Sequence, residues 1–279
     1  MLLRVICLIS VLSAAGITYA ASAFEGLRWL WLLPVSFVGS YVGCVALVFL
    51  FLLVLSWTID TSVPQEEDSK FMRWVARLVC PAVFPLLLCK VEMKGLEKLP
   101  RDGRFMLVCN HLGYLDPILL MAAFPDAQLA FISKRENGDM FIIGKLMHRI
   151  LTQKINREND REALRTIISC IKIVEADKAS IAVFPEGYTS LDAHLHHFRN
   201  GVFKIAQRAN IPVVVCTLTG TEKAFRNVLK LRRTPVTPHL VDVIPAEDTQ
   251  GVTTNIIGDR AHALMKADLG PVYAPDTEE

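Results

Sequence analysis

Two long runs without charged residues open the chain. Neither the run from Val5 to Phe24 nor the run from Trp29 to Ile59 contains an Asp, Glu, Lys or Arg. Each run is long enough to cross a hydrocarbon core of about 30 Å as a helix, since such a span takes roughly 20 residues. Because only Glu25 to Arg28 separates the two runs, residues 1–60 are predicted to form a transmembrane helical hairpin.

The charges beside the hairpin predict its orientation. Arg4 precedes the first run, and Lys70, Arg73 and Arg77 follow the second. Basic residues next to membrane spans favour the cytoplasmic side, so we expect an integral membrane protein with the rest of the chain on the cytoplasmic face. An alternative makes the first run a signal peptide that is cleaved near Ala21-Ser22-Ala23, in a secreted protein. The length of the run and its single preceding basic residue favour the membrane span.

After residue 60 the pattern of polar and apolar positions changes. Thr61 to Lys70 is polar and acidic, whereas Phe71 to Val91 mixes basic with apolar residues. This pattern predicts a linker and an interfacial amphipathic helix over residues 61–94. Beyond Leu99, short β-branched runs are typical of strands. We predict five of them, at Phe105–Cys109, Leu129–Ser133, Ser180–Phe184, Pro212–Leu218 and His239–Ile244.

Helical patterns separate these predicted strands. Asp160 is expected to cap a helix whose apolar positions keep a 3.6-residue spacing as far as Val174, and Phe198–Ala209 also has a helical pattern. Strands that alternate with helices indicate an α/β fold with a mostly parallel sheet flanked by helices. We assign this domain to residues 95–270 and a loose tail to residues 271–279.

Composition narrows the choice of function. Of the 279 residues 52% are hydrophobic, and the formal net charge is +2, so no nucleic-acid partner is indicated. The seven cysteines show no C-x-x-C spacing, which favours a reducing compartment. Neither a G-x-G-x-x-G motif nor a P-loop occurs, so nucleotide chemistry is not expected. His194, His196 and His197 could suggest a metal, but a polar loop is the favoured interpretation because no cysteine or spaced carboxylates accompany them.

A polar segment with a histidine directly follows the strand predicted at Phe105–Cys109. It reads Asn110-His111-Leu112-Gly113-Tyr114-Leu115-Asp116-Pro117. A histidine at the end of such a strand lies at the sheet edge where α/β folds usually bind ligands. If the turn continues into a helix, His111 and Asp116 come close to one face, and the carboxylate can orient the ring so that it acts as a general base. By spacing alone, a structural capping role for Asp116 is the favoured interpretation, because a histidine five residues from an aspartate often occurs by chance.

A second segment, Phe184-Pro185-Glu186-Gly187-Tyr188-Thr189-Ser190, follows another predicted strand. Pro-Glu-Gly predicts a turn in which Gly187 has a positive φ and Glu186 lies beside the backbone. An ordinary β-turn without a further role is the alternative. No G-x-S-x-G motif supplies a nucleophilic serine, which argues against the secreted hydrolase that a signal peptide would allow.

Taken together, these segments resemble the 1-acyl-glycerol-3-phosphate acyltransferases, the PlsC-like family of phospholipid biosynthesis. The His-x4-Asp block matches Asn110–Asp116, and the Phe-Pro-Glu-Gly block matches Phe184–Gly187. Between them, Lys134, Gly144 and Ile155-Asn156-Arg157 resemble the phosphate-contacting block of the family. After them, Phe198–Gly201 and the apolar Ile211–Val214 complete the order of blocks.

The resemblance implies the glycerolipid acyltransferase fold and direct transfer from an acyl-CoA or an acyl-carrier protein, with no cofactor. His111 would be the general base and Asp116 would orient it. Substrate contacts are implied for Lys134, Arg157, Glu186, Gly187 and Arg199, with Glu186 holding the glycerol or a cationic neighbour. The implied partners are a lysophospholipid acceptor, the thioester donor and membrane lipids; the oligomeric state is left open.

The chain departs from the family pattern at one point. The usual block continues Phe-Pro-Glu-Gly-Thr-Arg-Ser, but here Gly187 is followed by Tyr188-Thr189-Ser190, so the arginine is missing. Arg199 or Lys145 could substitute for it in binding phosphate. The loss makes a lysophospholipid with a larger headgroup a competing acceptor. A lipid-binding protein that has lost turnover is a further alternative, although both His111 and Asp116 are retained.

Overall fold

A computed structural model describes residues 1–21, 24, 26–134, 142–156, 159–190 and 192–275. It divides into two compact units, Met1–Ser62 and Val63–Glu279. In the first unit α1 (Leu2–Ala20) packs against α2 (Trp29–Trp57), and both helices are long and apolar enough to cross a membrane. The hydroxyls of Ser10 and Thr18 are buried and donate to backbone carbonyls four residues earlier. The predicted pair of apolar helices is therefore present, and α1 ends before Phe24.

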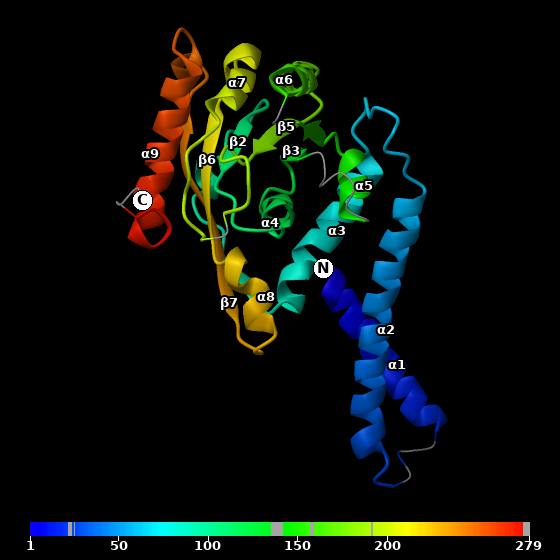
Figure 1. Ribbon diagram of the computed structural model, residues 1–279. Coiled ribbons are helices and arrows are strands. Elements are labelled where there is room, and N and C mark those ends of the chain that lie inside the picture. The colour runs from blue at the N-terminus through cyan, green and yellow to red at the C-terminus, as the bar shows by residue number, and fades with distance from the viewer. Residues whose placement is uncertain (22–23, 25, 135–141, 157–158, 191, 276–279) are drawn as a thin grey trace. The chain divides into compact units, whose positions relative to one another are not determined.

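The second unit is built on a seven-stranded sheet with the order β1-β7-β6-β2-β5-β3-β4 (Figure 1). All neighbouring strands are parallel except β6 and β7, which are antiparallel. The predicted mostly parallel sheet is thus confirmed. The strands are β1 (Cys89–Val91), β2 (Met106–Cys109), β3 (Leu129–Lys134), β4 (Gln153–Ile155), β5 (Ser180–Val183), β6 (Val213–Thr219) and β7 (Thr234–Ile244).

Helices cover both faces of the sheet, and the alternation of side chains along the strands divides the core between them. In β2, Met106 and Val108 face one apolar cluster, and Leu107 and Cys109 face the other. The first cluster is covered by α6 (Asp160–Glu175), α7 (Lys204–Ala209) and α9 (Thr254–Tyr273). The second is covered by α3 (Lys70–Leu86), α4 (Asp116–Ala123) and α8 (Ala224–Val228). A short α5 (Ile143–His148) follows β3.

Several expected boundaries differ from the structure. β1 lies within the segment that was predicted as linker and interfacial helix, so the sheet begins before residue 95. Asn159, not Asp160, caps α6, because its side chain accepts hydrogen bonds from the backbone amides of Arg161 and Glu162. The helix predicted at 198–209 is split into a 3₁₀ turn, Asn200–Phe203, and α7.

The tail predicted as loose from residue 271 is attached to the domain at Tyr273. The Tyr273 hydroxyl donates to Glu222, and its carbonyl accepts from the backbone amide of Leu195. Arg73 is also part of the packing: it pairs with Asp68 and donates to the carbonyls of Leu129 and Ile150. Arg73 therefore has a structural role in the domain, although the sequence analysis counted its charge as a signal of membrane orientation.

Candidate functional site

The loop after β2 places His111 at the carboxyl edge of the sheet. Asn110 anchors the start of this loop, because its amide group exchanges two hydrogen bonds with the backbone of Leu218 at the end of β6. Asp116 is the first residue of α4. The sequence suggested that His111 and Asp116 share a helix face, but His111 lies before the helix begins. The loop between the two residues turns back instead and brings them together. The predicted contact is nevertheless present, with His111 Nδ1 2.9 Å from Asp116 Oδ2.

Asp116 is fully buried and is surrounded by hydrogen-bond donors. Its Oδ2 atom accepts from the backbone amides of Leu112 at 2.6 Å and Gly113 at 2.8 Å, as well as from the His111 ring. Its Oδ1 atom accepts from the Thr221 hydroxyl at 2.6 Å. A buried carboxylate is costly unless such donors compensate the lost water. Because the carboxylate can only accept, His111 carries its proton on Nδ1 when the ring is neutral.

The other ring nitrogen of His111 faces a hydroxyl. Nε2 lies 3.0 Å from Thr189 Oγ1, and the imidazole stacks on the Phe184 ring with 4.2 Å between centroids. With the proton on Nδ1, Nε2 is the acceptor of the Thr189 hydrogen bond. A lone pair directed at a hydroxyl oxygen is the arrangement that a general base requires.

Glu186 holds the backbone of His111 in place. It is 1% exposed; Oε1 accepts from the His111 amide at 2.9 Å and Oε2 from the His196 amide at 3.1 Å. In addition, the Ser190 amide donates to the His111 carbonyl. Burial raises the pKa of the Glu186 carboxyl to about 7, although the two amide hydrogen bonds act in the opposite direction.

This geometry changes the interpretation of Glu186. Sequence reasoning expected its carboxylate to hold the glycerol or a cation, but both oxygens are turned to backbone amides, so Glu186 is a positioning residue. Gly187 has the expected positive φ, +88°, and its amide donates to the Phe184 carbonyl in the predicted turn. The turn thus brings Glu186 to the main chain of His111 and Thr189 to its ring.

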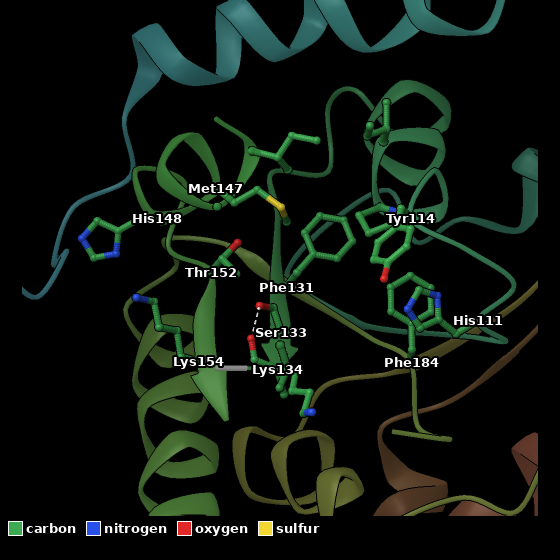
Figure 2. A pocket seen from close by; sticks show the side chains of 15 residues that line it. His111, Tyr114, Phe131, Ser133, Lys134, Met147, His148, Thr152, Lys154 and Phe184 are labelled. Atoms are coloured by element: carbon green, nitrogen blue, oxygen red, sulfur yellow. Dashed lines mark hydrogen bonds between the residues drawn. The ribbon is translucent and has the colours of Figure 1, made fainter. Parts of the chain in front are cut away.

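A cavity opens beside His111 and carries basic groups. Figure 2 shows His111 and Phe184 together at one end and Lys154 and His148 at the other. Lys134 also lines this cavity. Much of the remaining lining is apolar: Pro117, Ile118, Phe131, Ile132, Ile143 and Met147. Such a cavity can accommodate an apolar chain and an anionic group at the same time.

The other predicted substrate contacts lie elsewhere. Gly187 and Arg199 line a second cavity, between α6 and the segment that precedes α7, and Phe184 contributes to both cavities. Lys134 lines the cavity beside His111, whereas Gly187 and Arg199 line the neighbouring cavity, which shares Ile132 and Phe184 with the first. Arg157 lies outside the described residues.

Two residues of the site, Thr189 and Thr221, were missed in the sequence. A third, Lys154, was noticed only as one of several cations between residues 134 and 165 that could face an anionic substrate. Thr189 occupies the position where the family pattern has arginine, which was a usable signal. Lys154 lies in a short strand that no pattern revealed. Thr221 is far from Asp116 along the chain, and only the pairing of β2 with β6 brings the two together. His194 and His196 both pair with Asp192, and the described residues contain no group of three side chains suited to a metal.

Comparison with known proteins shows which family the chain resembles. A sequence model described as Acyltransferase matches residues 90–219. This stretch contains the histidine–aspartate pair and all the residues that line its cavity, and it is similar to the acyltransferase family. The resemblance seen in the motifs is thereby confirmed.

Individual relatives agree with this assignment. The chain is 31% identical over 164 residues to the 1-acyl-sn-glycerol-3-phosphate acyltransferase of Cocos nucifera, covering 58% of this chain and 53% of the relative. It is 33% identical over 156 residues to a chloroplastic enzyme of the same name from Brassica napus, covering 55% and 44%. The chain thus spans about half the length of these curated relatives.

A solved structure supports the fold. The 1-acyl-sn-glycerophosphate (LPA) acyltransferase PlsC from Thermotoga maritima superposes with a TM-score of 0.59. The similarity covers 78% of this chain and 86% of that chain, at 21% sequence identity. The predicted glycerolipid acyltransferase fold is therefore confirmed.

Proposed function

We propose that the protein transfers a fatty acyl group from an acyl thioester to the free hydroxyl of 1-acyl-glycerol-3-phosphate, producing phosphatidate. The observation that carries this proposal is the His111–Asp116 pair at the sheet edge, with Nε2 facing a hydroxyl oxygen beside a partly basic cavity. The names of the relatives support the acceptor. For the donor we retain acyl-CoA or an acyl-carrier protein, with no cofactor.

In the proposed reaction the acceptor hydroxyl replaces the Thr189 hydroxyl at Nε2. His111 takes the hydroxyl proton while the hydroxyl oxygen attacks the thioester carbonyl carbon. Asp116 stabilises the imidazolium that forms, because its carboxylate accepts the Nδ1 proton in a hydrogen bond. When the tetrahedral intermediate collapses, the carbon–sulfur bond breaks, and the leaving thiolate takes the proton from Nε2.

The phosphate of the acceptor is proposed to bind at the basic end of the His111 cavity. Lys134 and Lys154 both line this cavity, and a doubly charged phosphate favours paired cations. Arg157 is retained as a proposed third contact. Arg199 is proposed to act at the second cavity, toward a different part of a substrate.

A second acceptor class is favoured by one observation. Thr189 stands where the family pattern has arginine. Its hydroxyl forms a hydrogen bond with His111, and this position therefore supplies no positive charge. A site with fewer cations suits a phosphodiester with a headgroup better than a terminal phosphate. A lysophospholipid that bears a headgroup is therefore the alternative substrate.

We further propose an integral membrane protein whose catalytic domain faces the cytoplasm. The two apolar helices support membrane attachment. Five free cysteines are buried in the α/β unit, which supports a reducing compartment. The charges beside the hairpin support the orientation less than their number suggests, because Arg73 and Arg77 pair with Asp68 and Asp126.

An acyl-transfer assay on membranes that contain the full chain tests the proposal. Labelled oleoyl-CoA is offered with lysophosphatidate, glycerol 3-phosphate or headgroup-bearing lysophospholipids, with acyl-carrier protein as the alternative donor. We expect label in phosphatidate. Label only in a headgroup-bearing product would assign the second acceptor class. Lipid binding without transfer from either donor would instead identify a non-catalytic relative and refute the proposed activity.

A further inference from the structure

The connection between β6 and β7 presents unusually exposed apolar side chains. Leu229 and Leu231 are 86% and 85% exposed, more than any other large apolar side chain described in the Val63–Glu279 unit, and Phe225 is 54% exposed. Residues 225–233, which we name the β6–β7 segment, comprise most of α8 and the turn that follows it. Leucine side chains this exposed indicate a binding partner, because they bury almost no apolar surface within the domain.

Basic side chains alternate with these apolar ones. Arg226, Lys230, Arg232 and Arg233 are all exposed, and the segment contains no acidic residue. Within the described part of the chain, none of the four forms an ion pair. Some exposed cations elsewhere are paired, as Arg260 is with Asp248. The β6–β7 segment therefore carries four uncompensated positive charges around three exposed apolar side chains.

We propose that the β6–β7 segment inserts into the surface of a bilayer that contains anionic phospholipids. Apolar side chains in such a segment enter the boundary between headgroups and acyl chains, while lysine and arginine reach the phosphates. Each basic residue near an anionic surface adds roughly fivefold in affinity. A nucleic acid would use the cations but would leave the two leucines in water, so the pattern fits a bilayer better.

The base of the segment is rigid and leads directly to the catalytic pair. Gly220 has φ +92°, and a Cβ atom there would lie 2.1 Å from the Pro235 carbonyl oxygen. The next residue, Thr221, donates to Asp116, and Ala224 is fully buried. At the other end, Asn227 donates to the Thr234 hydroxyl. Insertion would thus hold the loop that supports Asp116 close to the bilayer surface, where lysophospholipids reside.

Depth-dependent quenching in the full-length protein tests this inference. Leu229→Cys carries an environment-sensitive fluorophore, in a chain with Cys7→Ser and Cys44→Ser, the two cysteines that are not buried. The protein is reconstituted in vesicles of phosphatidylcholine, with or without phosphatidylglycerol, that contain brominated lipid. We expect severalfold stronger quenching with phosphatidylglycerol. A label at Val272→Cys, 70% exposed but outside the segment, should show no such increase.

Charge removal provides a second readout. Arg232→Gln/Arg233→Gln should lower the ratio of inserted to free segment by roughly 25-fold, at about fivefold per charge. The matched variant Lys172→Gln/Arg208→Gln, which removes two exposed cations elsewhere, should leave the ratio unchanged.

Two results would overturn the inference. The first is a label at residue 229 that brominated lipids do not quench in either membrane. The second is a soluble polyanion, heparin, that changes the fluorescence as strongly as the anionic bilayer does, which would identify a polyanion site. Neither depends on acyl transfer: an inactive protein with an inserted segment would refute the proposed function and leave this inference standing.

Discussion

Two buried carboxylates flank His111, and they serve it in different ways. Asp116 contacts the ring and receives four hydrogen bonds, two of them from backbone amides of the same loop. Glu186 contacts only the main chain, through the amides of His111 and His196. Asp116 therefore sets the direction and protonation of the imidazole, whereas Glu186 sets the position of the loop that carries it.

The difference between Asp116 and Glu186 shows that the role of a carboxylate cannot be inferred from its presence in a sequence motif. Both residues are nearly or fully excluded from water, and both lie beside the same histidine. The donors around each carboxylate decide what it does. Glu186 has two donors, too few to offset its burial, and its pKa rises to about 7 as a result. Four substitutions test this distinction, in order of decreasing expected effect on activity.

The largest effect is expected for His111→Ala. Loss of the general base should lower kcat by about a thousandfold, within the usual range for such groups. Initial rates of acyl transfer, with the melting temperature as a check on folding, provide the measurement. His197→Ala, an exposed histidine outside both cavities, serves as the control. A rate for His111→Ala equal to that of the control would remove His111 from the mechanism.

Asp116→Asn should lower kcat by about a hundredfold, because a neutral amide stabilises the imidazolium poorly and can present its NH₂ group to His111. The amide would also face the donor groups of Leu112 and Gly113, so a lower melting temperature is expected. Asp126→Asn, at an 87% exposed carboxylate, is the control. If Asp116→Asn lowered only the melting temperature and not kcat, Asp116 would have a structural role alone.

Glu186→Gln should lower kcat only about tenfold, since it loosens the loop and leaves the ring pair intact. Its distinctive effect is on pH dependence. The folded pKa of about 7 lies above the unfolded value of 4.5, so the folded state binds more protons between these values. The free energy of unfolding therefore falls as pH rises from about 4.5 to about 7, by about 3 kcal/mol.

Melting temperatures across this pH range measure the effect. The decline should be present in the unmodified protein and in Glu175→Gln, an exposed control, and should be largely absent in Glu186→Gln. An identical decline in all three proteins would show that burial does not raise the pKa of Glu186.

The smallest effect is expected for Thr221→Val. This change leaves Asp116 Oδ1 without its hydroxyl donor, at a cost of about 1–3 kcal/mol in stability and a severalfold decrease in kcat. Thr221→Ser keeps the hydroxyl and should behave like the unmodified protein. Equal losses in both variants would mean that the methyl group, and not the hydrogen bond, is what matters.

Much of the fold follows from local patterns. Four of the five predicted strands lie within one residue of their expected ends, because buried parallel strands are continuous apolar runs between turn residues. The fifth, β7, begins at Thr234, five residues before the predicted start at His239. β1 and β4 were missed because each has only three residues, too few to show a pattern. The start of the loose tail was predicted too early, at residue 271. Tyr273 is held in the domain by Glu222 and Leu195, which lie far away in the chain.

The sequence alone determined the class of fold, the apolar hairpin helices, and the two loops that carry the chemistry, because each is encoded in a contiguous run of residues. It also identified His111 and Asp116 as partners, for a reason that proved incorrect in detail.

Only the tertiary structure decided how these loops meet. It turned Glu186 toward backbone amides, placed Thr189 on the second ring nitrogen of His111 and brought Thr221 to Asp116. It also placed Lys134 and Arg199 in neighbouring cavities. These contacts join residues on different strands, and their geometry depends on the order and register of the sheet. No local pattern specifies that order, because it follows from how the helices and strands pack together.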